Sequence, residues 1–200
     1  MQIVDFIQDS YQEFDDLHSL VLFSKNCNFK CKDCYNLEKV TYSDPIGNAI
    51  DIIKNHITPM HESVVFLGGE PTIWGNALIE STKFAKHKMN MKVKVFSNGS
   101  NPDVIKKLIL SKSVDSFSFD YKCSGNTIDV LGINIPLDQY KTSVFSCIKQ
   151  SLDANIKTEV RTTCFKNIDI NDIKKSLFST FPNINHIVQK PFEFSKQLVA

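Results

Sequence analysis

Short apolar runs alternate with segments of helical periodicity along most of the chain. Runs rich in β-branched and aromatic residues predict six strands, at residues 19–24, 63–67, 92–96, 115–122, 155–163 and 184–189. Apolar residues at helical spacing predict helices between these strands, at residues 46–57, 76–88, 102–110, 138–153 and 169–179. Residues 124–134 are predicted to form a loop.

The alternation of strands and helices predicts an α/β protein with a parallel sheet and right-handed crossovers. About six βα units are visible, fewer than the eight that close a complete barrel. We therefore expect an open, partial β/α barrel, with a flat doubly wound sheet as the alternative. A chain of 200 residues is the size of one ordinary domain, so residues 1–200 are expected to form a single domain.

Two of the predicted strands carry polar residues on one face, although the strands of a covered parallel sheet are usually apolar on both. The polar faces consist of Ser116, Ser118, Asp120 and Lys122 in one strand and of Lys157, Glu159, Arg161 and Thr163 in the other. If the opposite faces meet the helices, the charged faces line a polar lumen. The alternative is that both strands lie at an edge and expose one side to solvent. The lumen is favoured, since the polar groups lie toward the strand ends, where α/β proteins form their sites.

Composition argues against several classes of function. Hydrophobic residues make up 42% of the chain, enough for a sizeable core. The net charge is only +1, so no strong field attracts nucleic acid or an anionic membrane. No apolar run is long enough to span a bilayer, and the amino-terminal residues lack the pattern of a secretory signal. We therefore expect a cytoplasmic protein whose thiols stay reduced, without nucleic acid or membrane as a partner.

Three closely spaced cysteines carry the main chemical signal. Cys27, Cys31 and Cys34 follow the first predicted strand with the spacing C-x3-C-x2-C. Three thiolates hold three irons of a [4Fe–4S] cluster and leave the fourth iron open, whereas a closed electron-transfer cluster takes four protein ligands. The alternative is a structural zinc site completed by a distant histidine. The other cysteines, Cys123, Cys147 and Cys164, are dispersed and are expected to be buried structural thiols.

A glycine-rich turn is the second signal. Gly68, Gly69, Glu70 and Pro71 follow directly after the second predicted strand. Two glycines let the backbone approach a ligand closely, and the proline then fixes the exit of the turn. Both the turn and the cysteines are therefore expected to lie at the same end of the sheet, where the carboxyl ends of parallel strands meet.

With these two motifs the chain resembles the radical S-adenosylmethionine (SAM) superfamily. The resemblance rests on the cysteine triplet, the string GGEP and the string SNG after the third strand, and it covers essentially the whole chain. It implies that Cys27, Cys31 and Cys34 ligate a [4Fe–4S] cluster and that SAM chelates the open iron through its amino and carboxylate groups. It also implies that the turn formed by Gly68, Gly69, Glu70 and Pro71 hydrogen-bonds the SAM amino group.

Further strings are similar to those of the enzymes that activate glycyl radical enzymes, in particular anaerobic ribonucleotide reductase. These strings are CYN, GGEPT, SNGSNP, DYK and EVRTT. The likeness implies reductive cleavage of SAM to a 5′-deoxyadenosyl radical, a glycine of the reductase as the target, and flavodoxin or ferredoxin as the electron donor. It places near SAM the residues Tyr35, Ser97, Asn98, Asp120, Lys122 and Arg161.

Two departures from the family pattern bear on the site. An aromatic residue usually precedes the third cysteine, but here that position is Asp33 and the aromatic residue is Tyr35, just after the cysteine. Related activating enzymes often carry an acidic residue before the string Thr-Asn-Gly, where this chain has Phe96 and Ser97 before Asn98; this argues against a cation beside SAM. One alternative function is a radical SAM enzyme that acts on a small molecule, similar to 7-carboxy-7-deazaguanine synthase. The other is a non-catalytic zinc module used for binding.

Overall fold

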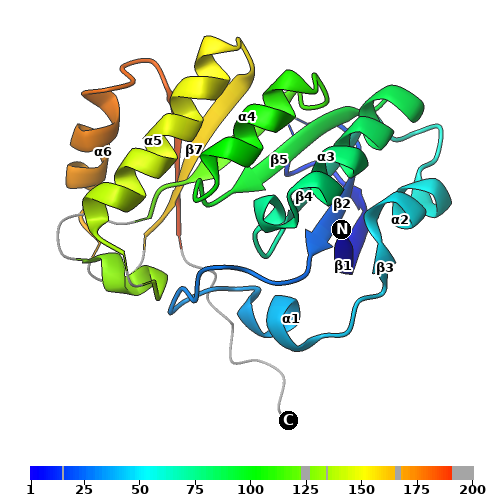
Figure 1. Ribbon diagram of the computed structural model, residues 1–200, viewed down its shortest axis with the longest axis horizontal. Coiled ribbons are helices and arrows are strands. Elements are labelled where there is room, and N and C mark those ends of the chain that lie inside the picture. Colours follow the sequence, from blue (N-terminus) through cyan, green and yellow to red (C-terminus); the bar gives the residue numbers. More distant parts are fainter. Residues whose placement is uncertain (15, 123–126, 134, 165–167, 191–200) are drawn as a thin grey trace.

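The computed structural model of the protein describes residues 1–14, 16–122, 127–133, 135–164 and 168–190 (Figure 1). Within these ranges the strands form one sheet in the order β3-β1-β2-β4-β5-β6-β7-β8. The strands are β1 (Gln2–Ser10), β2 (Ser19–Ser24), β3 (Gly47–Asn48), β4 (Ser63–Gly68), β5 (Lys92–Ser97), β6 (Ser116–Asp120), β7 (Lys157–Thr163) and β8 (Asn185–Gln189).

The parallel part of the sheet is the part that the sequence predicts. Strands β2, β4, β5, β6, β7 and β8 pair in parallel, while β1 runs antiparallel to β2 and β3 runs antiparallel to β1. The outermost strands β3 and β8 do not pair with each other within the described residues, so the sheet stays open. This confirms an α/β fold of the partial-barrel type. That residues 1–200 form a single domain stays a prediction.

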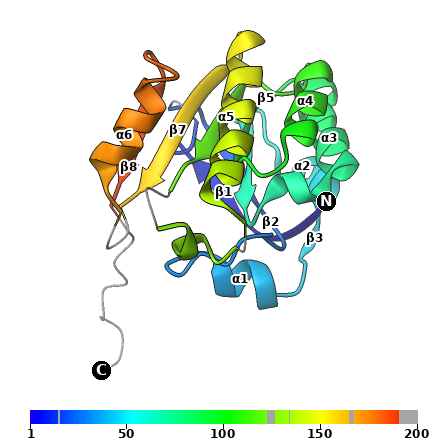
Figure 2. The ribbon, with the colours of Figure 1, turned by 60° about the vertical axis from the view of Figure 1, so that its left-hand side comes forward.

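Five helices lie along one face of the sheet (Figures 1 and 2). They are α2 (Ala49–His56), α3 (Asn76–Lys83), α4 (Pro102–Leu110), α5 (Leu137–Asp153) and α6 (Ile170–Phe178). A sixth, α1 (Leu37–Tyr42), lies with the cysteine segment below the sheet in Figure 1, and shorter turns complete the described elements: η1 (Pro71–Trp74), η2 (Phe84–Lys88) and η3 (Thr127–Leu131). None of the described helices combines the length and apolar character needed to cross a bilayer.

The structure departs from the predicted elements where polar residues decide the local conformation. The helix expected from residue 46 begins at Ala49, because the Asn48 side chain accepts a hydrogen bond from the backbone N–H of Asp51 at 3.0 Å and caps it. Strand β1 is not predicted, since Ile3 and Val4 alone among its residues are buried. An antiparallel strand with one solvated side shows no continuous apolar run. The predicted loop at residues 124–134 contains the short helix η3 where it is described.

The two polar strand faces lie in register on the sheet face that the helices do not cover. Strand β6 lies between β5 and β7, and β7 lies between β6 and β8, so neither is an edge strand. Glu159 pairs in register with Ser118 and is almost fully buried. Its carboxylate accepts from Lys94 Nζ at 3.0 Å and from Arg161 Nε at 2.8 Å. Burial alone would raise the pKa of Glu159, but these two cations hold it below its ordinary value.

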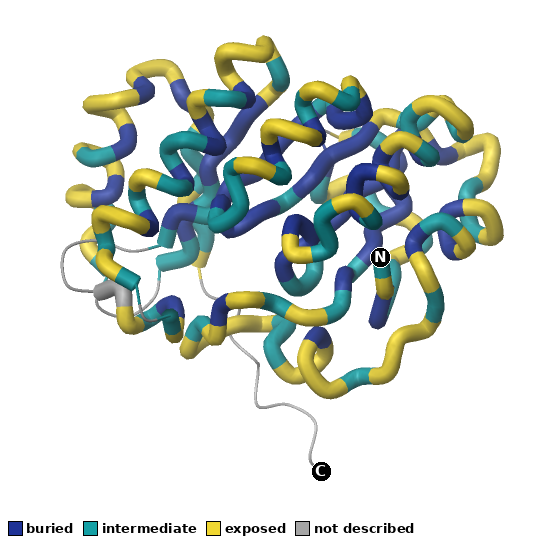
Figure 3. Tube along the Cα trace, viewed as in Figure 1, coloured by how far each residue is buried: buried dark blue, intermediate teal, exposed yellow. Residues whose placement is uncertain are grey.

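Burial follows the two layers, with the strands buried and the outer helix surfaces exposed (Figure 3). Phe117 and Phe119 of β6 are fully buried in the main core with the helices. On the opposite sheet face, Phe14 from the segment before β2 packs with Val21 and Val65. The Lys94 ammonium lies 5.6 Å from the Phe14 ring centroid. An aromatic residue therefore packs over β2, β4 and β5 on the sheet face that the helices do not cover.

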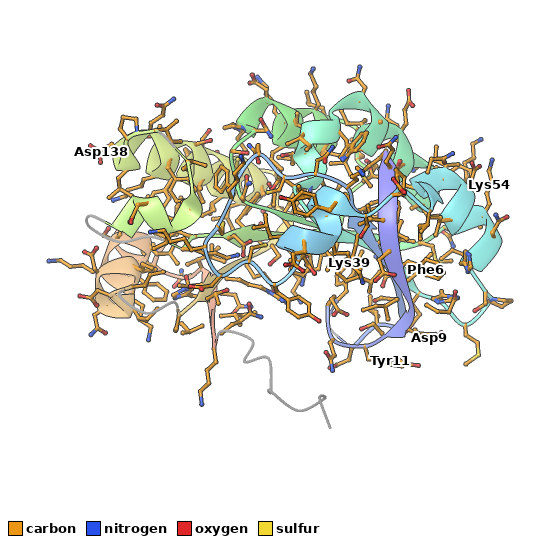
Figure 4. All side chains as sticks on the ribbon, turned by 90° about the horizontal axis from the view of Figure 1, so that it is seen from below. Phe6, Asp9, Tyr11, Lys39, Lys54 and Asp138 are labelled. Carbon is orange, nitrogen blue, oxygen red and sulfur yellow. The ribbon has the colours of Figure 1, made fainter. Side chains whose placement is uncertain are left out.

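A cluster of histidines occupies the carboxyl end of β1, where Figure 4 labels Asp9 and Tyr11. The rings of His18 and His61 stack with their centroids 4.5 Å apart, and His18 Nε2 lies 2.7 Å from Asp9 Oδ1. His61 Nδ1 accepts from the backbone N–H of Thr58 at 3.0 Å, so Nε2 carries the hydrogen that it donates to the Gln8 carbonyl at 2.7 Å. In this tautomer the one ring lone pair of His61, on Nδ1, accepts a hydrogen bond from Thr58. The cluster joins β1 to the segment before β4.

Candidate functional site

The three cysteines share one cavity of about 420 Å³ at the carboxyl ends of the parallel strands. Cys27, Cys31 and Cys34 all line it. The described ends of the strands β4 to β8 supply most of the remaining polar lining: Gly68, Gly69, Glu70, Ser97, Asn98, Asp120, Lys122, Thr163, Gln189 and Lys190. The position agrees with the rule that parallel α/β proteins bind ligands beyond the carboxyl ends of their strands.

The thiols have the surroundings expected of metal ligands. Cys27 and Cys31 are half-buried, Cys34 is exposed, and none of the three forms a disulfide. Burial raises the pKa of Cys27 to about 12 and that of Cys31 to about 11. Thiolates form here only if a cation compensates the cost of burying their charge. Among the described residues that line the cavity there is no histidine and no fourth cysteine. The donor set therefore fits three irons of a cluster with one iron left open, and it does not fit a Cys3His zinc site.

The glycine turn lies directly against the cysteine segment. Gly68 has a φ of +107°, and a Cβ added at Gly69 would lie 1.8 Å from the Asn26 carbonyl oxygen. The backbone N–H of Glu70 donates to that same carbonyl at 2.9 Å. Any side chain at residue 69 would displace this contact, so the close approach requires glycine. Pro71 is buried as the first residue of η1 and is not among the residues that line the cavity.

The Glu70 carboxylate faces the loop that follows β5. It accepts hydrogen bonds from Ser97 Oγ at 2.9 Å and from the backbone N–H of Asn98 at 2.6 Å, and two more from Thr72. Burial raises the pKa of Glu70, although these hydrogen bonds act in the opposite direction. Ser97 and Asn98 are thus brought to the same cavity as the glycine turn, as the sequence predicts for their positions.

Asp120 and Lys122 form an ion pair at the end of β6, with Lys122 Nζ 2.8 Å from Asp120 Oδ2. Burial lowers the pKa of Lys122. Asp120 and the thiols of Cys31 and Cys34 raise it by more than burial lowers it, so the pKa lies above the ordinary value. The lysine therefore carries a positive charge beside the cysteine segment.

Arg161 is not among the residues that line the cavity. Its Nε donates to Glu159 at 2.8 Å, and its guanidinium carbon lies 4.6 Å from the ring centroid of Phe96, which does line the cavity. Contact between Arg161 and SAM stays a prediction. Tyr35 lines the cavity and is 58% exposed, and the neighbouring Asp33 is exposed as well. Both residues named in the departure from the family pattern therefore lie at the rim.

Several cavity residues are not found by reading the sequence. Phe29, Leu131 and Tyr140 form an apolar wall, and the Tyr140 hydroxyl donates to the Asp120 carbonyl at 3.1 Å. Leu131 and Tyr140 come from segments without a motif, so no signal in the sequence marks them. Gln189 ends β8, and the rule that sites form at strand ends could have found it.

Comparison with known proteins assigns the family. Residues 21–179 match the family model described as the radical SAM superfamily, so the chain belongs to this superfamily. Its cofactors are the [4Fe–4S] cluster and SAM that the superfamily uses. More particularly, the chain is similar to two proteins of Methanocaldococcus jannaschii that are provisionally named glycyl-radical enzyme activating enzymes. One is 32% identical over 80% of this chain and 68% of its own length, and the other is 26% identical over 78% of this chain and 60% of its own length.

Solved structures share the fold at low sequence identity. Native anSMEcpe with bound AdoMet (SAM) and the peptide Kp18Cys has a TM-score of 0.64 and 17% identity, and covers 90% of this chain and 54% of its own. Streptococcus suis SuiB has a TM-score of 0.61 and 16% identity, covering 88% of this chain and 40% of its own. Methylornithine synthase (PylB) has a TM-score of 0.57 and 14% identity, covering 85% and 52%. The chain thus spans about half the length of the structures that it matches.

Proposed function

We propose that this protein is an activating enzyme that installs a glycyl radical on a partner enzyme, anaerobic ribonucleotide reductase. The observation that carries the proposal is the 32% identity over 80% of the chain with a relative provisionally named for glycyl-radical enzyme activation. The strings DYK and EVRTT resemble strings in activators of the reductase, and this likeness supports the reductase as the partner. We also propose flavodoxin or ferredoxin as the electron donor, because the reaction needs a one-electron donor of low potential.

The cavity residues divide into groups with separate tasks in this proposal. Cys27, Cys31 and Cys34 hold the cluster, and the glycine turn binds the amino group of SAM. With one electron from the donor, the bound cluster and SAM would supply cleavage of SAM to methionine and a 5′-deoxyadenosyl radical, and with it hydrogen-atom abstraction from the substrate. The apolar wall of Phe29, Leu131 and Tyr140 excludes water from this position, and the Lys122 ammonium compensates negative charge beside the cysteines.

A large substrate needs access to the cavity from outside. Cys34 and Tyr35 are exposed at the rim, and Gln189 and Lys190 line the cavity next to the open edge of the sheet at β8. Two of the structural neighbours were solved with a peptide bound, anSMEcpe and SuiB. An open mouth of this kind supports a loop of a partner protein as the substrate.

The function is tested by electron paramagnetic resonance (EPR) after anaerobic reconstitution. The reduced protein is incubated with SAM and anaerobic ribonucleotide reductase, and the expected result is a glycyl radical signal on the reductase. The matched controls are the same mixture with the Cys34→Ala variant and a reductase whose target glycine is alanine, both of which should stay silent. Cleavage of SAM without a radical on the reductase would contradict the proposed partner and favour a small-molecule substrate.

A further inference from the structure

Three loops at the mouth of the sheet are each hydrogen-bonded to the other two. They are the cysteine loop (residues 24–36), the glycine turn (residues 68–72) and the asparagine loop (residues 97–101), which follow three neighbouring strands of the sheet. Each of the three connections consists of at least two hydrogen bonds.

The first connection joins the glycine turn to the cysteine loop through the backbone. Gly69 N–H donates to the Ser24 carbonyl at 3.0 Å, and Glu70 N–H donates to the Asn26 carbonyl at 2.9 Å. Asn26 has a φ of +65°, a conformation that turns the chain toward Cys27. The turn therefore fixes the backbone just before the first cysteine.

The second connection joins the glycine turn to the asparagine loop through the Glu70 side chain. Glu70 Oε1 accepts from Ser97 Oγ at 2.9 Å, and Oε2 accepts from Asn98 N–H at 2.6 Å. Thr72 donates to Oε1 as well, from its hydroxyl at 2.6 Å and its backbone at 3.0 Å. Because the carboxylate is buried and receives four hydrogen bonds, its position is fixed on both loops.

The third connection joins the cysteine loop to the asparagine loop through a pair of side-chain amides. It completes a closed circuit of hydrogen bonds among the three loops. Asn98 Nδ2 donates to Asn28 Oδ1 at 2.9 Å, and Asn28 Nδ2 donates to Ser100 Oγ at 2.8 Å. Ser100 N–H donates in turn to Asn98 Oδ1 at 3.0 Å. Asn28 lies within the C-x3-C segment, so these hydrogen bonds join the asparagine loop to the stretch between the first two cysteines.

We infer that Glu70 and Asn28 are positioning residues that couple the cysteine loop to the SAM-binding turn, so that the three loops act as one unit. The inference rests on the proposed assignment of the cluster and of SAM to this cavity. Substituting either residue breaks one connection of the hydrogen-bonded circuit and uncouples the loops. A second substitution then has little further effect on the coupling. The effects of the two substitutions on SAM affinity are therefore smaller together than the product of the single effects.

The experiment is a double-mutant cycle with Asn28→Ala and Glu70→Gln, read as SAM affinity by equilibrium dialysis against reconstituted protein of equal iron content. Asn28 is exposed, so its removal should not impair folding. Glutamine at residue 70 keeps the shape of the side chain but presents an N–H group to other N–H and O–H donors. We expect SAM affinity to fall by about twofold to tenfold for Asn28→Ala and by about fivefold to a hundredfold for Glu70→Gln. The SAM affinity of the double variant should equal that of the single variant with the lower affinity, to within about twofold.

Ser113→Ala is the matched control, since Ser113 Oγ lies 2.8 Å from Thr82 Oγ1 in a buried pair away from the cavity. It should lower the melting temperature and leave SAM affinity unchanged. If Glu70→Gln does not fold, Ser97→Ala removes a bond to the same carboxylate and replaces it in the cycle. The inference would be overturned if the effect of the double variant on SAM affinity equals the product of the two single effects. It would also be overturned if the single variants change only the melting temperature. Failure of the proposed function would instead appear as a missing glycyl radical with SAM affinity and coupling intact.

Discussion

Replacing any one of Cys27, Cys31 and Cys34 with alanine is expected to lower the rate of SAM cleavage by more than about 100-fold. Loss of a residue that merely supports a metal ligand already costs about 10- to 100-fold in affinity or activity, and loss of a ligand costs more. The described cavity lining offers no histidine or further cysteine to replace the missing thiolate. The measurement is the yield of 5′-deoxyadenosine from the reduced, reconstituted variant, determined by chromatography.

The fold should survive these three substitutions. Cys34 is exposed and Cys27 and Cys31 are half-buried, so alanine leaves no large cavity in the core. Circular dichroism of each variant should therefore match that of the unmodified chain. Cys164→Ala is the matched control, because Cys164 is a free thiol that does not line the cavity, and it should retain cleavage. A variant of the triplet that still cleaves SAM at the normal rate would contradict the assignment of its ligand role.

Gly69→Ala is expected to lower the free energy of unfolding by about 3 kcal/mol and to prevent incorporation of the cluster. The added Cβ would lie 1.8 Å from the Asn26 carbonyl oxygen and 2.6 Å from its carbonyl carbon. Both are backbone atoms, so no side-chain rotation relieves the clash and the turn must separate from the cysteine loop. Denaturant unfolding measures the first effect, and iron content after reconstitution measures the second.

Gly47→Ala is the control for this prediction. A Cβ there would meet only the Ile52 side chain, at 3.5 Å, which is an ordinary contact. Its stability and iron content should stay close to those of the unmodified chain. Equal iron content in Gly69→Ala and Gly47→Ala would show that the close approach of the glycine turn to Asn26 is not needed for the cluster.

The parallel part of the fold follows from patterns that are local in the sequence. Each parallel strand is a short apolar run, since its helix-facing side is buried in the core, and the helices between them keep an apolar stripe. Strand β1 cannot be predicted in this way, because it runs antiparallel and only two of its residues, Ile3 and Val4, are buried. Its place in the sheet depends on pairing with β2, which no local pattern reveals.

The candidate site likewise contains residues that the sequence predicts and contacts that it does not. The cysteines, the glycine turn and Asn98 directly follow their strands, and the topology brings them to one cavity, as expected from their positions. The circuit through Asn28 and the apolar wall at Leu131 depend on contacts between segments far apart in the chain. The partners of individual side chains could not be predicted from the sequence either. Glu70 faces the asparagine loop, and Arg161 pairs with Glu159 and lies against Phe96.

We propose that the three cysteines hold a [4Fe–4S] cluster whose fourth iron stays open to SAM, and the proposed function depends on this arrangement. The most direct measurement is the EPR spectrum of the reduced, reconstituted protein with and without SAM, combined with analysis of iron, sulfide and zinc. We expect four irons and four sulfides in each chain and a cluster signal that changes when SAM is added, because SAM becomes a ligand of the open iron. A spectrum that is identical with and without SAM, or a colourless protein that carries zinc, would contradict it.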